Sequence, residues 1–323
     1  MDSFKIYDQA YLATLFSVRP GEVKIGERVQ LTRDLYSIAE SSARFVLLGI
    51  PEDIGVRANH GIGGTDSAWL PALSTLLNMQ SNDFMDGSEI LVLGAFDIAE
   101  PADRGIDGLR RKVHEIDLLV YPVIEKIIAA GKIPVVVGGG HNNAYGLIRG
   151  ASAALKCAIN VVNIDAHTDL RPAEGRHSGN GFRYALEEGY LENYRIFGLA
   201  ENYVHAHLLP GLRQNEQIRA VWFRDLLKSR EPVIKHWETF MEDMPEPRGL
   251  EIDADSISGV LSSAVTPSGF ALNDIRTILL SGRHFCYMHL CEGAVRLNDG
   301  REDRNTAKAI AFLISDFMAA QRD

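Results

Sequence analysis

The chain has 323 residues, of which 46% are hydrophobic and 24% are charged, a balance typical of globular proteins rather than of disordered or fibrous chains. Its formal net charge of -10 disfavours nucleic acid and anionic membranes as main partners, since both would be repelled. The three cysteines, an odd number without zinc-type or redox spacing, argue against a disulfide framework. The first residues lack a signal-peptide pattern and no apolar run is long enough to cross a bilayer, so we expect a cytoplasmic protein.

Short apolar, β-branched runs alternate with helix-like segments, which is the pattern of parallel strands covered on both faces. About eight strands are expected, at Phe45–Pro51, Glu89–Phe96, Ile133–Val137, Ala158–Ile164, Tyr194–Leu199, Arg219–Phe223, Gly249–Ile252 and Phe285–Cys291. Because no repeat or linker separates them, we expect residues 1–323 to form one three-layer α/β/α domain with a mostly parallel sheet.

The segments outside these strands are expected to be mainly helical. Residues 1–44 carry no strong strand pattern and are expected to form a partly helical N-terminal extension that wraps the domain. Asp103–Ala130 has apolar residues at helical spacing and ends at Gly131, although Pro122 should kink or split this helix. Asn305–Met318 is expected to pack a helix on the sheet through one stripe, formed by Ala309, Phe312, Leu313 and Phe317.

A first polar cluster, Gly138 to Asn143, follows the strand Ile133–Val137, at the sheet edge where open α/β sheets bind ligands. Its glycines permit a sharp turn and a close backbone approach, after which His141 would project into the cleft. Taken alone, this histidine is better explained as a loop residue that caps a helix.

A second cluster, Asp165-Ala-His167-Thr-Asp169, directly follows the strand Ala158–Ile164. If the chain stays nearly extended, residues two apart share one side, so these three side chains converge. Two carboxylates and an imidazole brought together would repel and desolvate one another without a cation. A divalent metal is therefore the natural partner, and a solvated strand end is the alternative.

A third cluster places Asp253 and Asp255 on one face of the chain, beside Ile252. Such a pair is unusual in a core strand, and helix N-capping accounts for only one of the two. Together the clusters supply four carboxylates and two imidazoles, from His141, Asp165, His167, Asp169, Asp253 and Asp255. This oxygen-rich set suits two Mn²⁺ ions, which roughly 3.5–4 Å apart can share a hydroxide and lower its pKa toward neutrality.

From about Phe45 to its end, the chain resembles the ureohydrolases, the family of arginases, agmatinases and formimidoylglutamases. Asp165-Ala-His-Thr-Asp169 and Asp253-Ala-Asp255 are similar to the two aspartate-rich metal motifs of that family, and His141 stands where its first histidine ligand falls. The resemblance implies an arginase-like fold and a hydrolase with two Mn²⁺ per subunit that cleaves a C–N bond of a small amidine or guanidine. It also implies a homo-oligomer, a trimer or a hexamer.

Three segments are similar to the formimidoylglutamase branch, namely Gly138-Gly-Gly-His141, Gly55–Gly61 and His177–Arg183. The resemblance therefore implies hydrolysis of N-formimidoyl-L-glutamate to L-glutamate and formamide, a step of histidine degradation. Ser258-Gly259 stands where the family usually has Asp and Pro, and Gly293-Ala294 replaces its Asn-Pro, which leaves the exact substrate open.

The resemblance also suggests roles for single residues. Glu292 aligns with the family glutamate that pairs with the substrate amidinium, and a structural salt bridge is the alternative. Asp169 is expected to pass a proton to the leaving nitrogen, and His177 could assist that transfer. Donors for a dianionic substrate are expected at Ser178, Asn180, Arg183 and Arg57, with Arg171 as a further candidate. For each arginine, a solvent-exposed surface role is the alternative.

Other functions remain open at this point. An arginase, an agmatinase or another guanidino-acid hydrolase would release urea, and arginines rather than acids at the cleft mouth would favour an anionic substrate. A non-catalytic protein on this fold would have lost a metal ligand or Glu292, and neither is lost. A deacetylase of related architecture would need a single zinc site and a tyrosine motif that the sequence lacks. His289 is expected to be a satisfied packing residue rather than a ligand.

Overall fold

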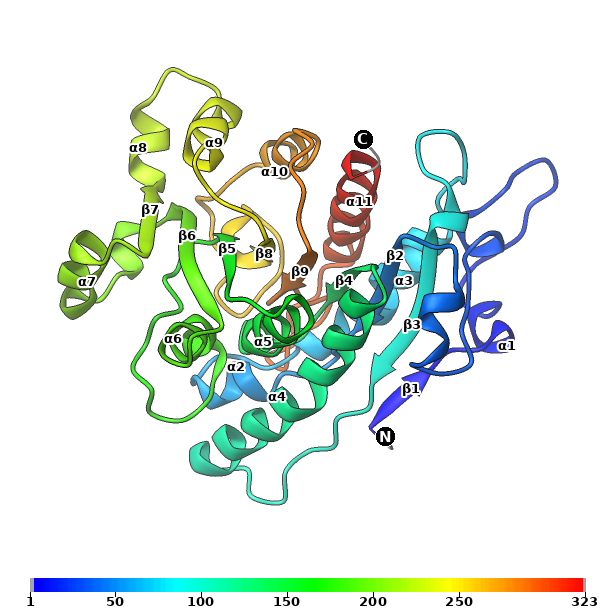
Figure 1. The fold of residues 1–323 in the computed structure, drawn as a ribbon, viewed down its shortest axis with the longest axis horizontal. Helices are drawn as coiled ribbons and strands as arrows, with labels where there is room; N and C mark the ends of the chain where they lie inside the picture. The colour runs from blue at the N-terminus through cyan, green and yellow to red at the C-terminus, as the bar shows by residue number, and fades with distance from the viewer. Residues whose placement is uncertain (1–2, 322–323) are drawn as a thin grey trace.

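In the computed structural model, which describes residues 3–321, one nine-stranded sheet forms the centre of the chain (Figure 1). Its strands lie in the order β1-β3-β2-β4-β9-β8-β5-β6-β7. Their bounds are β1 Phe4–Ile6, β2 Phe45–Gly49, β3 Ile90–Phe96, β4 Ile133–Val137, β5 Ile159–Ile164, β6 Leu191–Leu199, β7 Ile218–Trp222, β8 Arg248–Asp253 and β9 Tyr287–Cys291. The pairs from β3 to β7 are parallel, and β1 joins β3 antiparallel.

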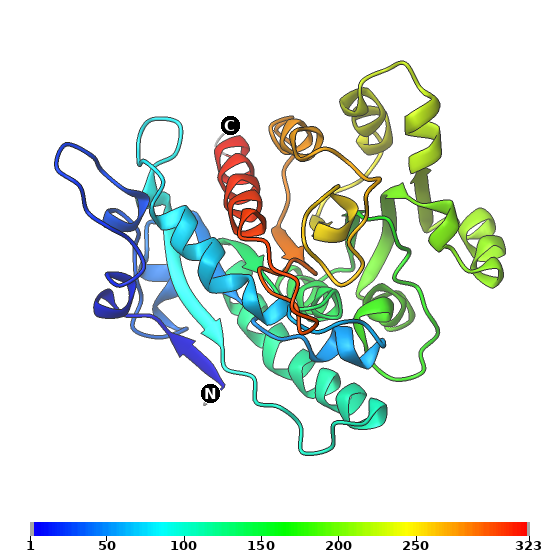
Figure 2. The same ribbon diagram turned by 180° about the vertical axis from the view of Figure 1, so that it is seen from behind.

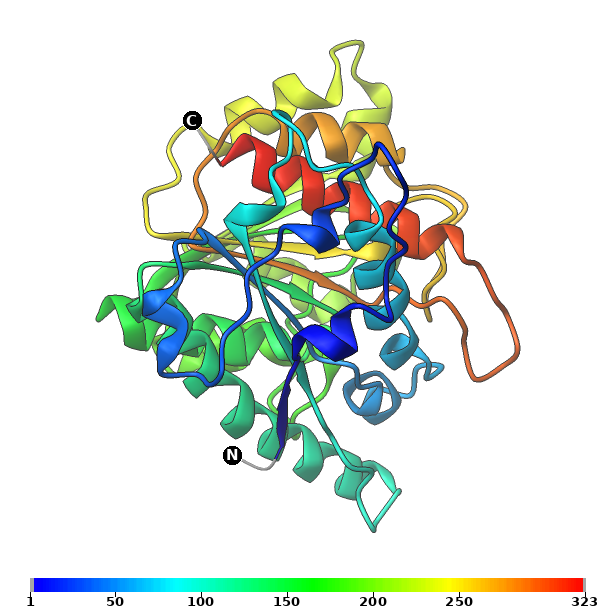
Figure 3. The same ribbon diagram turned by 90° about the vertical axis from the view of Figure 1, so that its right-hand side faces the viewer.

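Helices cover both faces of this sheet, as the edge-on view in Figure 3 shows. The helices are α1 Gln9–Leu12, α2 Ile54–Ala58, α3 Trp69–Leu77, α4 Ile106–Ala129, α5 Asn143–Leu155, α6 Gly181–Glu187, α7 Leu209–Gln214, α8 Phe223–Lys228, α9 Val233–Met241, α10 Leu272–Leu279 and α11 Asn305–Ala320. One layer contains α2, α4, α5 and α6, which contact one another in that order. The other contains α3, α11, α10 and α9, and Figure 2 shows α11 on that side. The predicted three-layer α/β/α class is confirmed.

The two layers enclose two hydrophobic cores, one on each face of the sheet. Along β2, Phe45 and Leu47 belong to the core under α3 and α11, whereas Val46 and Leu48 belong to the core under α4 and α5. All five residues of β2 are buried. This two-sided burial explains why the strands read as continuous apolar runs rather than alternating ones.

The expected elements differ from the structure at three points. β1 was not predicted, because three residues at a sheet edge carry too little pattern. Of the kink or split expected at Pro122, the split does not occur, because α4 runs from Ile106 to Ala129 through this residue; Leu118, whose carbonyl loses its donor, is exposed to solvent. Phe312 is 42% exposed and lies against the guanidinium of Arg276, so the buried stripe of α11 lacks it.

The ends of the predicted domain, residues 1, 2, 322 and 323, lie outside the described residues. Between them, no helix combines the length and the apolar character needed to cross a bilayer. All three cysteines are free thiols, in agreement with the absence of a disulfide pattern.

Candidate metal centre and active site

Four adjacent strands bring the predicted ligands to one place. The strands β4, β9, β8 and β5 are neighbours in the sheet, and their carboxyl ends meet at the same edge. His141 follows β4, Asp165 follows β5, Asp253 ends β8 and Glu292 follows β9. Segments about 150 residues apart in the sequence therefore meet at one edge because of the strand order.

His141 lies at the centre of a first group of carboxylates. Its Nδ1 atom is 2.8 Å from Asp169 Oδ2, 3.1 Å from Asp253 Oδ2 and 3.4 Å from Asp165 Oδ2. The donor atoms of these four residues all lie within 4.8 Å of one another, which is close enough for one ion to contact them together.

His167 forms the centre of a second group. Its Nδ1 atom is 3.1 Å from Asp255 Oδ2 and 3.5 Å from Asp165 Oδ1. Asp165 offers one oxygen to each histidine and therefore belongs to both groups. Two groups that share a carboxylate form the arrangement expected of a pair of bridged divalent ions.

The two aspartate motifs reach this geometry through turns rather than an extended chain. Asp165 Oδ1 accepts the backbone N–H of His167, and Asp253 Oδ1 accepts that of Asp255. Asp169 has a positive φ of +48°, a conformation that costs a non-glycine residue about 1–3 kcal/mol. Residues 165–169 are therefore not extended, which was the condition under which convergence was argued, but their side chains converge through the turn instead.

The electrostatics of the cluster call for positive charge. Burial and the neighbouring Asp255 raise the pKa of Asp253 well above its usual range, and burial and Asp253 do the same for Glu292. Burial also raises the pKa of Asp255 to about 6, in spite of the nearby His167. Without cations, Asp253 and Glu292 would tend to keep their protons, and the binding of a metal would displace them.

Several buried polar atoms at the site have no hydrogen-bond partner among the described residues. They include both ring nitrogens of His141 and the Oδ1 atom of Asp255. Buried polar atoms are usually paired, so these three need an explanation. The position of His141 Nδ1 and Asp255 Oδ1 among the aspartates fits divalent ions, whereas His141 Nε2 faces Glu251 at 3.5 Å. The oxygen-rich donor set with two imidazoles suits manganese better than a thiolate-seeking structural zinc.

Glu292 is held by backbone geometry close to this centre. It has a positive φ of +58°, and its Oε1 atom accepts the backbone N–H of His141 at 3.0 Å. It lines a cleft of about 220 Å³ together with His167, Asp169 and Asp255. A larger groove of about 930 Å³ contains none of these residues.

Two of the predicted substrate donors, Ser178 and the further candidate Arg171, line this cleft. Asn59, which was not predicted, lines it beside them. Arg171 donates to Asn59 Oδ1 at 2.7 Å, and Asn59 Nδ2 lies 3.3 Å from Ser178 Oγ. These three side chains form a connected row of polar groups that we name the polar row.

The other predicted donors are occupied elsewhere. Arg57 pairs with Asp53 and Glu100, and Arg183 pairs with Glu187 at 3.4 Å on α6. Asn180 is fully buried and accepts hydrogen bonds from Arg176 and from the backbone of His177, so it shapes the loop. None of the three lines the cleft.

His177 also lies outside the residues that line the cleft. It is buried, and its Nδ1 atom accepts the backbone N–H of Gly179 at 3.1 Å. Burial, and then the cations Arg171 and Arg110, lower the pKa of His177 to about 4. The ring is therefore neutral at pH 7 and supports the loop that carries Ser178.

Three buried acids that the sequence analysis missed support the loops of the site. Glu52 accepts the backbone N–H groups of Gly55 and Gly140 and an N–H of Asn143. Asp117 on α4 holds Arg176 through two hydrogen bonds, and Glu251 lies beneath His141. An acid inside an apolar strand or at its end, as at Glu251 and Glu52, is the one signal that could have found them.

Comparison with known proteins agrees with this architecture. Formimidoylglutamase of Streptococcus gordonii is 28% identical over 242 residues, which cover 69% of this chain and 70% of that protein. Formimidoylglutamase of Streptococcus pyogenes serotype M3 is 27% identical over 257 residues, 74% of each chain.

Two solved structures share the fold. Formimidoylglutamase from Bacillus subtilis matches with a TM-score of 0.76 and 16% identity, over 95% of this chain and 94% of that one. Trypanosoma cruzi formiminoglutamase with Mn²⁺ matches with a TM-score of 0.74 and 20% identity, over 94% of this chain and 100% of that one. The sequence pattern of the arginase family matches residues 43–319, and the chain therefore belongs to that family.

Proposed function

We propose that this protein is a binuclear manganese hydrolase that cleaves N-formimidoyl-L-glutamate with water into L-glutamate and formamide. The observation that carries the proposal is the meeting of two histidines and four aspartates in two groups that share Asp165. Membership of the arginase family supports hydrolysis at an amidine or guanidine carbon, and the names of the relatives support the formimidoyl substrate.

His141, Asp165, Asp169 and Asp253 would hold one ion, and Asp165, His167 and Asp255 would hold the other. A bound metal pair would supply a water molecule ionised near neutral pH and would offset the charge of the aspartates. The manganese found with the Trypanosoma cruzi protein supports the choice of metal.

Asp169 and Glu292 carry the remaining chemistry. We assign to Asp169 the transfer of a proton to the leaving nitrogen, because its carboxylate both faces His141 and lines the cleft. Glu292 would accept two N–H groups of the planar amidinium and orient its carbon toward the attacking water. His177 is better explained as a support of the neighbouring loop than as a proton carrier.

The charges along the cleft favour an anionic substrate. Its acidic lining residues are Asp169, Asp253, Asp255 and Glu292, and each already has a role at the metals or the amidinium. No acid among the described lining residues is left to bind a second cationic group, such as the ammonium of agmatine. Arg171 and the rest of the polar row would instead bind the carboxylates of the glutamate moiety.

Arginine also carries a carboxylate, so arginase is the second candidate. The release assay separates the two: protein loaded with Mn²⁺ is given formimidoylglutamate, arginine, agmatine and other guanidino acids, and formamide and urea are measured. We expect formamide from formimidoylglutamate and little urea. Urea release with no formamide would overturn the choice of substrate. A homo-oligomer, trimeric or hexameric, and a cytoplasmic location complete the proposal.

The chemistry itself is tested by removing ligands. Asp165→Ala and Asp255→Ala should abolish metal binding and activity while the fold persists, as measured by metal analysis and circular dichroism. Full activity in protein that contains no metal would defeat the mechanism.

A further inference from the structure

A buried polar pair lies beneath the metal centre, between β8 and β9. Glu251 and His289 are opposite each other in the strand register, and both side chains are 0% exposed. His289 Nδ1 is 2.6 Å from Glu251 Oε2, and the hydroxyl of Tyr287 donates to Glu251 Oε1 at 2.8 Å. His289 Nε2 faces the carbonyl of Gly138 at 3.2 Å, so the pair also connects β9 to the loop before His141.

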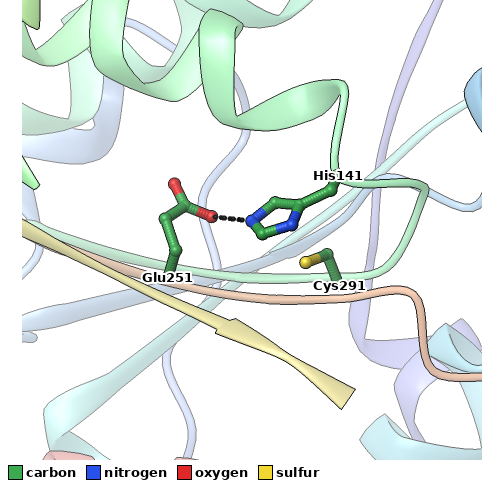
Figure 4. A group of neighbouring side chains, drawn as sticks. All are labelled: His141, Glu251 and Cys291. Atoms are coloured by element: carbon green, nitrogen blue, oxygen red, sulfur yellow. Dashed lines mark ion pairs between the residues drawn. The ribbon is translucent and has the colours of Figure 1, made fainter. Parts of the chain in front are cut away.

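Figure 4 shows how Glu251, one member of this pair, meets His141. The Nε2 atom of His141 points to Glu251 Oε2 at 3.5 Å, while its Nδ1 atom faces the three carboxylates of the first group. If Nδ1 gives its lone pair to a cation, Nε2 must carry the proton of the neutral ring. Metal-binding histidines usually donate this second N–H to a carboxylate or a carbonyl, and Glu251 is the acceptor that faces it.

Stability alone gives a poor reason for the pair. Burying a carboxylate and an imidazole away from water is costly, and replacing such a buried polar group with apolar residues of similar volume is often neutral or stabilising. Its position therefore calls for a functional explanation.

We propose that Glu251 and His289 act as a positioning pair for His141. Glu251 accepts the Nε2–H and so directs Nδ1 to the first metal ion, and His289 fixes Glu251 and ties it to the Gly138 carbonyl. This inference rests on the metal centre of the proposed function and deepens it.

The same neighbourhood includes Cys291, which together with His141 and Glu251 would make a third group of metal-type ligands (Figure 4). Both oxygens of Glu251 already accept hydrogen bonds, and the Cys291 thiol lies 3.6 Å from the carbonyl of Ile252. Burial also raises the pKa of this thiol, so it stays protonated. The group is better explained as support for His141 than as another metal site.

The test measures Mn²⁺ affinity by calorimetry in chelator-treated full-length protein, and the thermal unfolding of the metal-free protein beside it. Glu251→Gln keeps an oxygen that can accept the Nε2–H of His141. The triple variant Glu251→Leu/Tyr287→Phe/His289→Leu removes the whole polar group and leaves no unpaired charge. Asp316→Asn is the control, since Asp316 pairs with Arg276 between α10 and α11, away from the metal ligands.

A positioning role predicts a graded loss. The triple variant should bind the first Mn²⁺ roughly 10- to 100-fold more weakly while its metal-free unfolding temperature is kept or raised, and Glu251→Gln should fall between it and the wild type. Asp316→Asn should bind Mn²⁺ as the wild type does. A purely structural role predicts that Glu251→Gln binds Mn²⁺ more weakly than the triple variant does. The reason is that only Glu251→Gln leaves a buried imidazole badly paired.

Wild-type Mn²⁺ affinity in the triple variant would overturn the inference. Because the readout is metal affinity, a protein that binds manganese but does not hydrolyse formimidoylglutamate would refute the proposed substrate and leave the positioning pair intact.

Discussion

Asp117→Ala tests the buried support of the cleft loop. Asp117 and Arg176 are joined by two hydrogen bonds of 2.8 and 3.1 Å, and their side chains are 1% and 4% exposed. Removing the carboxylate leaves the guanidinium buried with only two neutral acceptors, Asn180 Oδ1 and the Asn142 carbonyl. Breaking such a pair typically costs about 3–5 kcal/mol, which is a large part of the roughly 5–15 kcal/mol that stabilises a domain.

Urea unfolding of the metal-free protein measures this loss. The matched control is Asp316→Ala, because its partner Arg276 is 34% exposed and the loss of such a pair should cost about 1 kcal/mol or less. Asp117→Ala should also raise KM, since Arg176 holds the loop that carries Ser178. A loss below about 1 kcal/mol in Asp117→Ala, or equal losses in the two variants, would refute the burial argument.

Three further predictions concern the cleft, the metals and the loop. Arg171→Ala should raise KM for formimidoylglutamate about 10- to 100-fold at similar kcat, since a charged hydrogen bond contributes about 1.5–3 kcal/mol; Arg183→Ala is the control, and equal effects would disprove the cleft assignment. Removing the metal with a chelator should lower the unfolding temperature, and added Mn²⁺ should restore it. A ligand at 100 times its Kd stabilises the folded protein by about 2.7 kcal/mol. An unfolding temperature that does not change would contradict metal binding. The pKa of His177 is lowered to about 4 in the folded chain, compared with about 6.5 in the unfolded chain. Between these two pH values the unfolded chain binds a proton that the folded chain does not. The free energy of unfolding should therefore fall as the pH drops from about 6.5 to about 4. His177→Gln should flatten this loss in urea unfolding of the metal-free protein, and parallel curves for variant and wild type would count against it.

The fold could be predicted because its signal is local. Strands such as β2 and β4 are buried on both faces, so each appears in the sequence as a continuous apolar run. Ends of parallel strands meet at one edge, and this allowed the ligands to be sought after β4, β5 and β8. β1 was missed because three residues cannot show a period.

The direction of long polar side chains could be predicted only in part. Arg57 and Arg183 were as plausible as Arg171 in the sequence, but the first two are drawn to Glu100 and Glu187. Glu100 is 43 residues from Arg57 in the sequence and is brought to it only by packing. Glu187, in contrast, is the i+4 neighbour of Arg183 on α6, so this pair could have been anticipated from the sequence. His289 is like Arg57 in this respect, since it was expected to be a satisfied packing residue and its acidic partner is visible only in the strand register.

The most direct test of the metal centre is a crystal of the Mn²⁺-loaded protein, with anomalous scattering recorded at the manganese edge. Two peaks are predicted, one among His141, Asp165, Asp169 and Asp253 and the other among Asp165, His167 and Asp255. A single peak, or manganese bound away from these side chains, would contradict the two-metal account.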